Sequence, residues 1–197
     1  MASFIASPYY PLVKDIIYLL IALGGVIVAC MGLSTWRRQL KGNVEYETAR
    51  RLYKAVLKVR DAMSYVRNPW IPLSEMESAS AKHPEADKTT NRAVYHVRWE
   101  KITEAMSELQ SEELESEVLW GQEIVEKLKP LKLCVVELNN YVSQFLNPSL
   151  RTSNYSSDMI YEFEDATGKK DKFTEEINAA VGAVGNFLKP KYKFSER

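Results

Sequence analysis

Few residues in this sequence have the type and spacing that chemistry requires, and the clearest pair is His96 and Glu100. They stand four positions apart, so on a helix both side chains lie on one face, with Glu104 one turn further along. A metal site needs three or four such ligands, and the only other histidine, His83, falls in a predicted loop. Because glutamate is so frequent here that chance produces such pairs, we predict no metal site.

The usual motifs of catalysis are missing from the sequence. It has no glycine-rich phosphate loop, no G-x-S-x-G elbow and no H-E-x-x-H zinc motif. The two cysteines, Cys30 and Cys134, are too few for a disulfide framework, and we expect Cys134 to be buried. With 26 basic and 26 acidic residues the net charge is +0, so the basic excess typical of nucleic-acid binding is absent. We predict a non-catalytic protein without a cofactor, and nucleic acid is not an expected partner.

The element that dominates the sequence is the uncharged run 16–36. On a helix its 21 residues reach about 31 Å, which matches the roughly 30 Å hydrocarbon core of a bilayer. A cleavable signal peptide would be shorter and would carry its basic residues in front, whereas Arg37, Arg38 and Lys41 follow this run. We therefore predict a single-pass anchor in an inner or plasma membrane. By the positive-inside rule, residues 1–15 lie outside, and the chain from residue 37 onward is cytoplasmic.

Small residues recur along one stripe of this predicted anchor, at Ala22, Gly25, Ala29 and Gly32. Helices associate in lipid through close packing, and small residues let two backbones approach each other. The stripe predicts a homo-oligomer held together by the anchors. The alternative interpretation is that glycine and alanine are simply common in spanning helices.

The segment 37–189 reads as an all-α bundle of about four helices. Apolar residues at helical spacing continue from Ala49 to Val66 with no proline before Asn68, so the anchor is expected to run into the first helix. Three further helices are expected at 95–109, at 111–147 with a bend near Pro130, and from Asp171 or Thr174 to Pro190. Loops are expected at 68–89 and 147–171, with a loop favoured over a short strand at 159–165, and a basic tail at 190–197.

Two helix faces of opposite charge stand out in this bundle. Nine glutamates and a single lysine lie between positions 100 and 126, while the first helix carries basic residues at i, i+4 spacing. The basic face has three interpretations: a solvated surface, a contact with anionic lipid, or a docking face for the acidic segment. The predicted interaction faces comprise Arg50, Lys54 and Lys58 on one side and Glu104, Glu108, Glu112 and Glu115 on the other.

A small helical bundle on one anchor resembles the membrane-tethered HEPN-type proteins of bacterial defence. Nuclease members of that family carry an arginine, then four to six residues, then a histidine. The positions where that arginine would stand hold Asn91, Thr90 and Thr89 before His96, and Ser78, Glu77 and Met76 before His83. Arg92 is one step too close to His96. The resemblance therefore implies an architecture but no nuclease activity.

The stretches "LWGQEIVEKLKPLKLCVVEL" and "FTEEINAAVGAVGNFLKP" are also similar to parts of bacterial single-pass membrane proteins, and this similarity implies no activity.

Three functions are weighed against these observations. The first is a membrane-anchored, non-catalytic adaptor or scaffold with an unidentified protein partner. The second is an oligomeric effector that perturbs the membrane, for example in defence or stress response. A pore of single helices would need a polar lining, and between Ile16 and Leu33 only the hydroxyl of Tyr18 offers one, so the adaptor is favoured. A HEPN-like nuclease comes third because its motif is absent.

Overall fold

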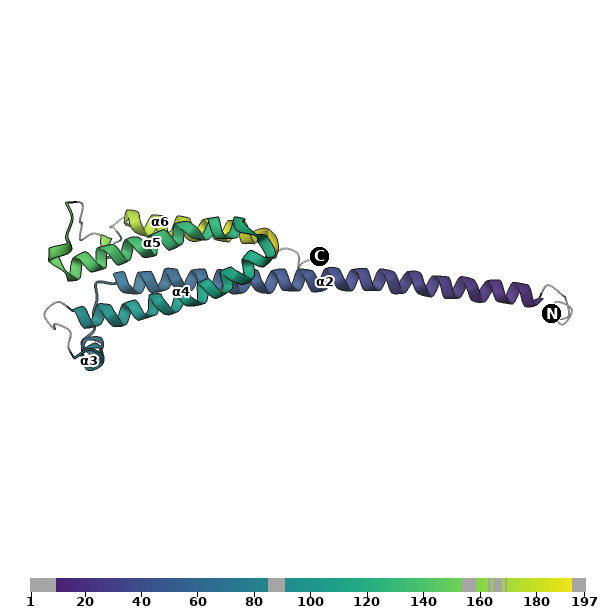
Figure 1. The fold of residues 1–197 in the computed structure, drawn as a ribbon, viewed down its shortest axis with the longest axis horizontal. Coiled ribbons are helices and arrows are strands. Elements are labelled where there is room, and N and C mark those ends of the chain that lie inside the picture. Colours follow the sequence, from purple (N-terminus) through teal and green to yellow (C-terminus); the bar gives the residue numbers. More distant parts are fainter. Residues whose placement is uncertain are drawn as a thin grey trace. The chain divides into compact units, whose positions relative to one another are not determined.

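The chain folds almost entirely into helices in a computed structural model that describes residues 10–84, 91–153, 159–162, 164, 168 and 170–192 (Figure 1). The prediction of an all-α fold, with a long apolar N-terminal helix followed by a helical bundle, is confirmed. Its elements are α2 (Tyr10–Arg67), α3 (Leu73–Lys82), α4 (Arg92–Trp120), α5 (Gln122–Leu146), the short 3-10 helix η2 (Pro148–Leu150) and α6 (Lys172–Tyr192).

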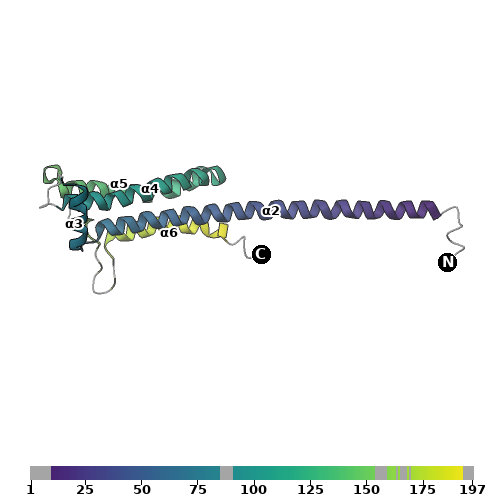
Figure 2. The ribbon, with the colours of Figure 1, turned by 90° about the horizontal axis from the view of Figure 1, so that it is seen from below.

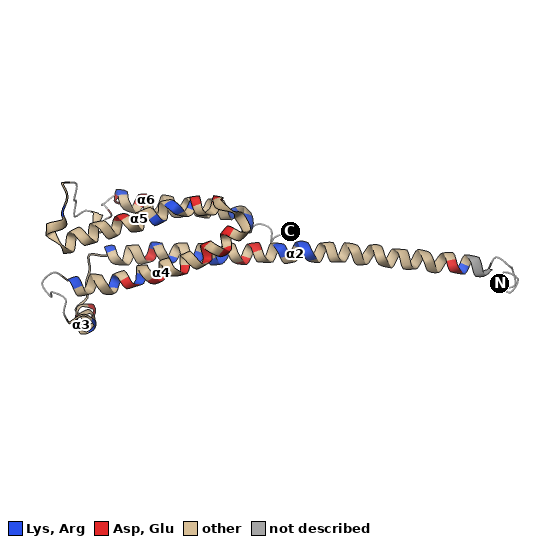
Figure 3. Cartoon of the chain, viewed as in Figure 1, with Lys and Arg blue, Asp and Glu red and all other residues tan. Residues whose placement is uncertain are grey.

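The chain divides into two compact units, Met1–Val44 and Glu45–Arg197, and α2 contributes to both. In the first unit, the only helix of the described residues that is long and apolar enough to cross a membrane has none of its apolar window buried inside the protein. Figure 3 shows this uncharged stretch of α2, with charged residues at either end. The expectation of one such helix near the N-terminus is confirmed, whereas the side of the membrane on which each end lies stays a prediction.

The second unit is built around the apolar face that the sequence places on its first helix. Leu52, Val56, Val59 and Met63 of α2 are fully buried. They belong to one core cluster with residues of the other long helices, among them Ile102 and Leu109 of α4, Leu128, Leu131 and Leu138 of α5, and Val184 and Leu188 of α6. Figure 2 shows α6 lying along the C-terminal part of α2, with α4 and α5 as the neighbouring pair. This bundle positions every side chain discussed below.

The segment expected to be a loop at 68–89 contains the helix α3. Its sequence, LSEMESASAK, has no long apolar face, so periodicity alone does not reveal it. The helix is stabilised instead by contacts made in three dimensions. Ala79 is buried against Ala93 and Val94 of α4, with Met76 packed beside them. Tertiary contact therefore overrides a weak local pattern.

The boundary expected between two helices near position 110 is also wrong. α4 continues through the glutamate-rich stretch to Trp120, and the chain turns at Gly121, where φ is 65° and ψ is −158°. Residues with a Cβ atom strongly disfavour this backbone conformation, so the chain leaves the helix at the glycine. Residues 107–117 hold mostly good helix formers and no glycine or proline, which explains why α4 does not end earlier.

The last helix begins as the sequence indicates. Asp171 accepts the backbone N–H of Thr174 at 3.0 Å, which is the contact expected of a residue that caps α6. Helix α6 runs through Pro190 to Tyr192, beyond the predicted end, and the remainder of the tail lies outside the described residues. In the segment 159–165, Glu164 forms an isolated antiparallel bridge with Lys170. Residues 163 and 165 of this segment lie outside the described residues.

Candidate interaction surface

The charged residues on α2 and α4 set the register of the two helices within the second unit. Arg51 Nε donates to Glu112 at 3.1 Å, and its Nη2 also pairs with Glu115. About two turns further along α2, Lys58 Nζ lies 2.5 Å from Glu108 Oε2. As numbers rise on α2 they fall on α4, so the helices are antiparallel. The pKa of Arg51 is raised, mainly because Glu112 accepts its hydrogen bond.

The structure places the predicted basic residues in different surroundings. Lys58 contacts the acidic segment, whereas Arg50 is exposed and lies 3.9 Å from Glu47 of its own helix. Lys54 is exposed, and the described ion pairs do not include it. Arg51 was not among the predicted face residues, yet it makes the contacts expected of Arg50. A one-residue rotation around the helix separates the two, which is too fine a distinction for a spacing argument.

The acidic stripe of α4 is largely neutralised inside the unit. Lys82 Nζ lies 3.4 Å from Glu100, and Lys132 of α5 pairs with the buried Glu113. Glu104 lies in a shallow groove between α2 and α4 that Lys58 and Lys101 also line. Figure 3 shows acidic residues gathered on α4 beside basic residues of α2. The use of these faces by a partner stays a prediction.

His83 lies close to His96 and Glu100 in the structure. The His83 and His96 rings lie 5.5 Å apart, and His83 Nε2 is 3.6 Å from Glu100 Oε1. Across the described part of the chain, however, no group of three His, Cys, Asp or Glu side chains has an arrangement that could hold a metal ion.

Arg98 is the centre of a buried polar site on α4. Its side chain is 1% exposed, on the apolar face of α4, and its Nε and Nη2 donate to both carboxylate oxygens of Glu75 at 2.8 and 2.9 Å. Nη1 and Nη2 also donate to the carbonyls of Asn68 and Trp70 at 2.6 and 2.8 Å. A bidentate guanidinium–carboxylate pair of this kind fixes both partners in one geometry. The chain from Asn68 to Glu75 is thereby clasped onto α4.

Tyr65 completes this Arg98 clasp. Its ring lies beneath the Arg98 guanidinium, 5.0 Å from the centroid, and its hydroxyl donates to Glu75 Oε1 at 2.8 Å. The hydrogen bonds from Arg98 lower the pKa of Glu75 against the opposing effect of burial, and Glu75 in turn raises the pKa of Arg98. Burial is the main cause that raises the pKa of Tyr65. The acid is therefore ionised and the phenol neutral at neutral pH.

A second buried arginine, Arg67, forms the Arg67 clasp at the end of α2. Its side chain is 1% exposed and donates to Asp171 at 2.8 Å and to Thr174 Oγ1 at 2.6 Å, both at the start of α6. It also donates to the carbonyls of Met159 and Tyr161, each at 3.0 Å. The Phe173 ring centroid lies 5.1 Å from its guanidinium carbon. This one side chain therefore binds the segment before α6 to the end of α2.

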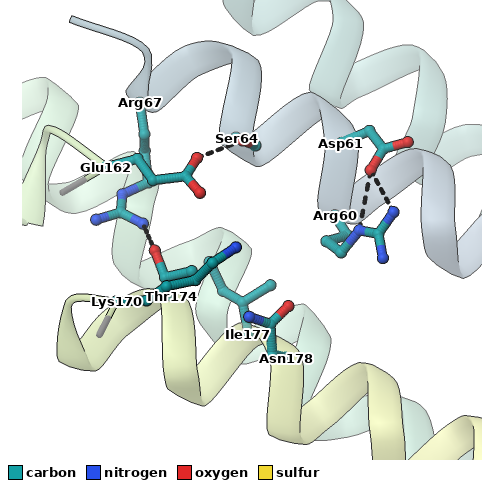
Figure 4. Close-up of a pocket in the computed structure, with 9 residues that line it drawn as sticks. All are labelled: Arg60, Asp61, Ser64, Arg67, Glu162, Lys170, Thr174, Ile177 and Asn178. Carbon is teal, nitrogen blue, oxygen red and sulfur yellow. Dashed lines mark hydrogen bonds and ion pairs between the residues drawn. The ribbon is translucent and has the colours of Figure 1, made fainter. Parts of the chain in front are cut away.

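A polar pocket of about 250 Å³ opens beside the Arg67 clasp (Figure 4). Within it Arg60 pairs with Asp61, and Glu162 accepts a hydrogen bond from the hydroxyl of Ser64. Lys170 lines this pocket together with Thr174 and Asn178. The pocket is therefore a mixed-charge surface between α2 and α6.

The Arg98 clasp holds two large apolar side chains out in solvent. Trp70 is 74% exposed and Leu73 is 71% exposed. The backbone beneath Trp70 is fixed, because its N–H donates to Asn68 Oδ1 at 2.9 Å and its carbonyl accepts from Arg98. Exposed tryptophan contributes little to the fold, but it is the residue most enriched at the centres of protein interfaces. We call Trp70 and Leu73 the apolar knob.

Sequence reasoning missed the apolar knob and both clasps. A signal for Arg98 exists, because it stands between Tyr95 and Ile102 on the apolar stripe of its helix, where a charged residue needs a partner. No comparable signal points to Arg67, which stands at the end of its helix.

The residues predicted to act in the anchor lie in the first unit. Arg37, Arg38 and Lys41 are exposed, as are the small residues Ala22 and Ala29. A Cβ atom built at Gly25 or Gly32 meets no atom within 4 Å, so the stripe is open along this chain. Comparison of the whole chain with family models, curated proteins and solved structures gives no match.

Proposed function

We propose that this chain is a membrane-anchored, non-catalytic adaptor whose cytoplasmic helical unit binds a protein partner through the apolar knob. The observation that carries the proposal is the fixed exposure of Trp70 and Leu73 above the Arg98 clasp. A residue whose backbone is held in one place before binding loses less entropy on association. The proposed topology has the N-terminus outside and the second unit in the cytoplasm.

The charged faces support a secondary role in this proposal. Most of the α4 glutamates already have cationic partners within the unit, and exposed ion pairs contribute only about 0–1 kcal/mol each. They therefore orient a partner more than they retain it. Of the three predicted basic residues of this face, Arg50 and Lys54 are the two that do not pair with α4 and are exposed.

Photo-crosslinking in cells tests the adaptor proposal. A photoreactive residue at Leu73 should give a discrete adduct that disappears when Trp70→Ala is added, because the indole would carry the contact. The matched control is the same probe at Leu150, which is 56% exposed and lies in η2. Adducts that are equal at both positions, or that persist in Trp70→Ala, would reject the knob as a binding surface.

A second candidate is the oligomeric effector that perturbs the membrane, and the small-residue stripe Ala22, Gly25, Ala29 and Gly32 would allow close packing of its anchors. We expect Gly25→Leu with Ala29→Leu to break an assembly that forms through the anchors. Light scattering of the full chain in detergent, corrected for the micelle, measures this. A large assembly that the double substitution dissociates would favour the effector, and an unchanged mass would remove the stripe from consideration.

A further inference from the structure

One end of the second unit is defined by the turn between α4 and α5. Because Arg51 pairs with Glu115 and the helices are antiparallel, Trp120 lies level with the beginning of the unit at Glu45. The end of α6 reaches the same place, since Lys191 Nζ lies 4.9 Å from the Trp120 ring centroid. We call this the turn end, and it is the end at which the chain enters the unit from the predicted anchor.

The turn end carries apolar side chains that the fold does not use. Val118 is 87% exposed, the highest value among the large apolar side chains that the structure describes, and Leu119 is 38% exposed. Trp120 is half-buried and meets Phe187 edge-on, with ring centroids 6.1 Å apart. The ammonium of Lys191 lies over both rings, 5.0 Å from the centroid of Phe187. The turn end thus combines two exposed aliphatic side chains, Val118 and Leu119, with Trp120 and Lys191.

The covalent chain restricts how far this end can travel from a membrane. Trp36, the last residue of the uncharged run, precedes Glu45 by nine residues. Even fully extended, nine residues span about 31 Å. Whatever angle the two units adopt, Glu45 stays within that reach of Trp36, which keeps the turn end beside Glu45 at a high effective concentration near the bilayer surface.

We propose that the turn end rests in the headgroup layer of the same membrane, with Val118 and Leu119 inserted and Lys191 directed to lipid phosphates. Tryptophan and lysine beside aliphatic side chains are the residue types that favour this layer, because each combines an apolar body with a polar tip. Glu117 and Glu123 flank the turn. Carboxylates are excluded from the hydrocarbon, so the contact is limited to the interface.

This inference rests on the membrane-spanning role proposed above and adds an orientation to it. The Arg98 clasp lies at the other end of the unit, because Arg98 contacts the carbonyls of Asn68 and Trp70 just after α2 ends. With the turn end at the membrane, the apolar knob is directed into the cytoplasm.

Spin labels on the full chain in nanodiscs of phosphatidylcholine and phosphatidylglycerol, at three to one, test the proposal. Labels are placed on the native Cys30, on Cys30→Ala with Val118→Cys, and on Cys30→Ala with Leu73→Cys. Cys134 is buried, and burial raises the pKa of its thiol, so it reacts little. The measurement is collision with oxygen, which concentrates in lipid, relative to a water-soluble nickel complex.

We expect the oxygen-to-nickel ratio at position 118 to exceed that at position 73 at least threefold and to fall below that at Cys30. Equal, water-like ratios at 118 and 73 would overturn the proposal. If Cys30 is lipid-exposed in that experiment, the spanning helix stands and only the turn-end contact fails. If Cys30 also gives a water-like ratio, the anchor itself fails.

A second pair of variants tests the cause of the contact. Here the spin label is placed on the turn, in the variant Cys30→Ala with Gln122→Cys. Adding Val118→Asp to this variant should return the oxygen-to-nickel ratio of the label to a water-like value. Adding Leu133→Asp, at a residue 57% exposed on the flank of α5, should leave it unchanged. An effect of both substitutions, or of neither, would show that insertion of Val118 does not hold the turn end at the membrane.

Discussion

The two ends of the helical unit are built on different principles. At the end holding the Arg67 and Arg98 clasps, each buried guanidinium binds main-chain carbonyls and a carboxylate at once. At the turn end, one glycine reverses the chain and a lysine covers two aromatic rings. The clasp end buries polar groups that satisfy one another, whereas the turn end leaves Val118 exposed. Buried polar networks therefore fix irregular chain where helix packing alone cannot.

Loss of Arg98 should have the largest effect on stability. Arg98→Ala leaves the Glu75 carboxylate and two carbonyls with unmet hydrogen bonds, and removal of one partner from a buried pair costs about 3–5 kcal/mol. Denaturant unfolding of the full chain in detergent, followed by circular dichroism, measures the loss. Arg50→Ala, an exposed arginine of α2, is the control, and we expect a change below about 0.5 kcal/mol. Equal losses in both variants would contradict the clasp.

The turn end should respond to a change of backbone rather than of charge. Gly121→Ala places a side chain at φ 65° and ψ −158°, and we expect a loss of about 1–3 kcal/mol from strain. Gly182→Ala in α6 meets no atom within 4 Å and should instead stabilise the unit by about 0.5–1 kcal/mol. The same unfolding experiment compares them. A neutral Gly121→Ala would show that the turn does not require glycine.

Acid should weaken the clasp end more than the turn end. The pKa of Glu75 is lower in the folded chain than in the unfolded one, so its contribution is complete above the unfolded value of about 4.3. That contribution is lost as the pH falls from there through the folded pKa. Glu75→Gln removes the titration, so its free energy of unfolding should fall less steeply with acid than that of the wild type. Parallel slopes in unfolding curves collected below pH 5 would contradict the assignment.

The smallest effects are expected from the exposed pairs between α2 and α4. Arg51→Ala and Lys58→Ala should each cost below about 1 kcal/mol, and the loss should shrink in high salt because these charges are screened. A double-mutant cycle of Lys58 with Glu108 isolates one pair. A coupling that is insensitive to salt would indicate that the pair is more shielded than its exposure suggests.

Much of the fold follows from sequence because it depends on local composition and period. The run 16–36 is apolar without interruption, and the stripe from Ala49 to Val66 repeats every three or four residues, so both helices could be predicted. The cap at Asp171 also follows from residue type. Helix α3 could not be predicted in the same way, because Ala79 is buried only when α4 is present to cover it.

The candidate site divides along the same line. The sequence by itself determined a single long apolar helix, a charged helical bundle after it, and opposite charges on two of the helix faces, since each depends on neighbours along the chain. Only the tertiary structure decided that Arg51 rather than Arg50 meets the acidic face, that Arg67 and Arg98 are buried, and that Trp70 and Val118 are exposed. These outcomes depend on groups that are up to 107 positions apart, as Arg67 and Thr174 are, and no local pattern carries that information.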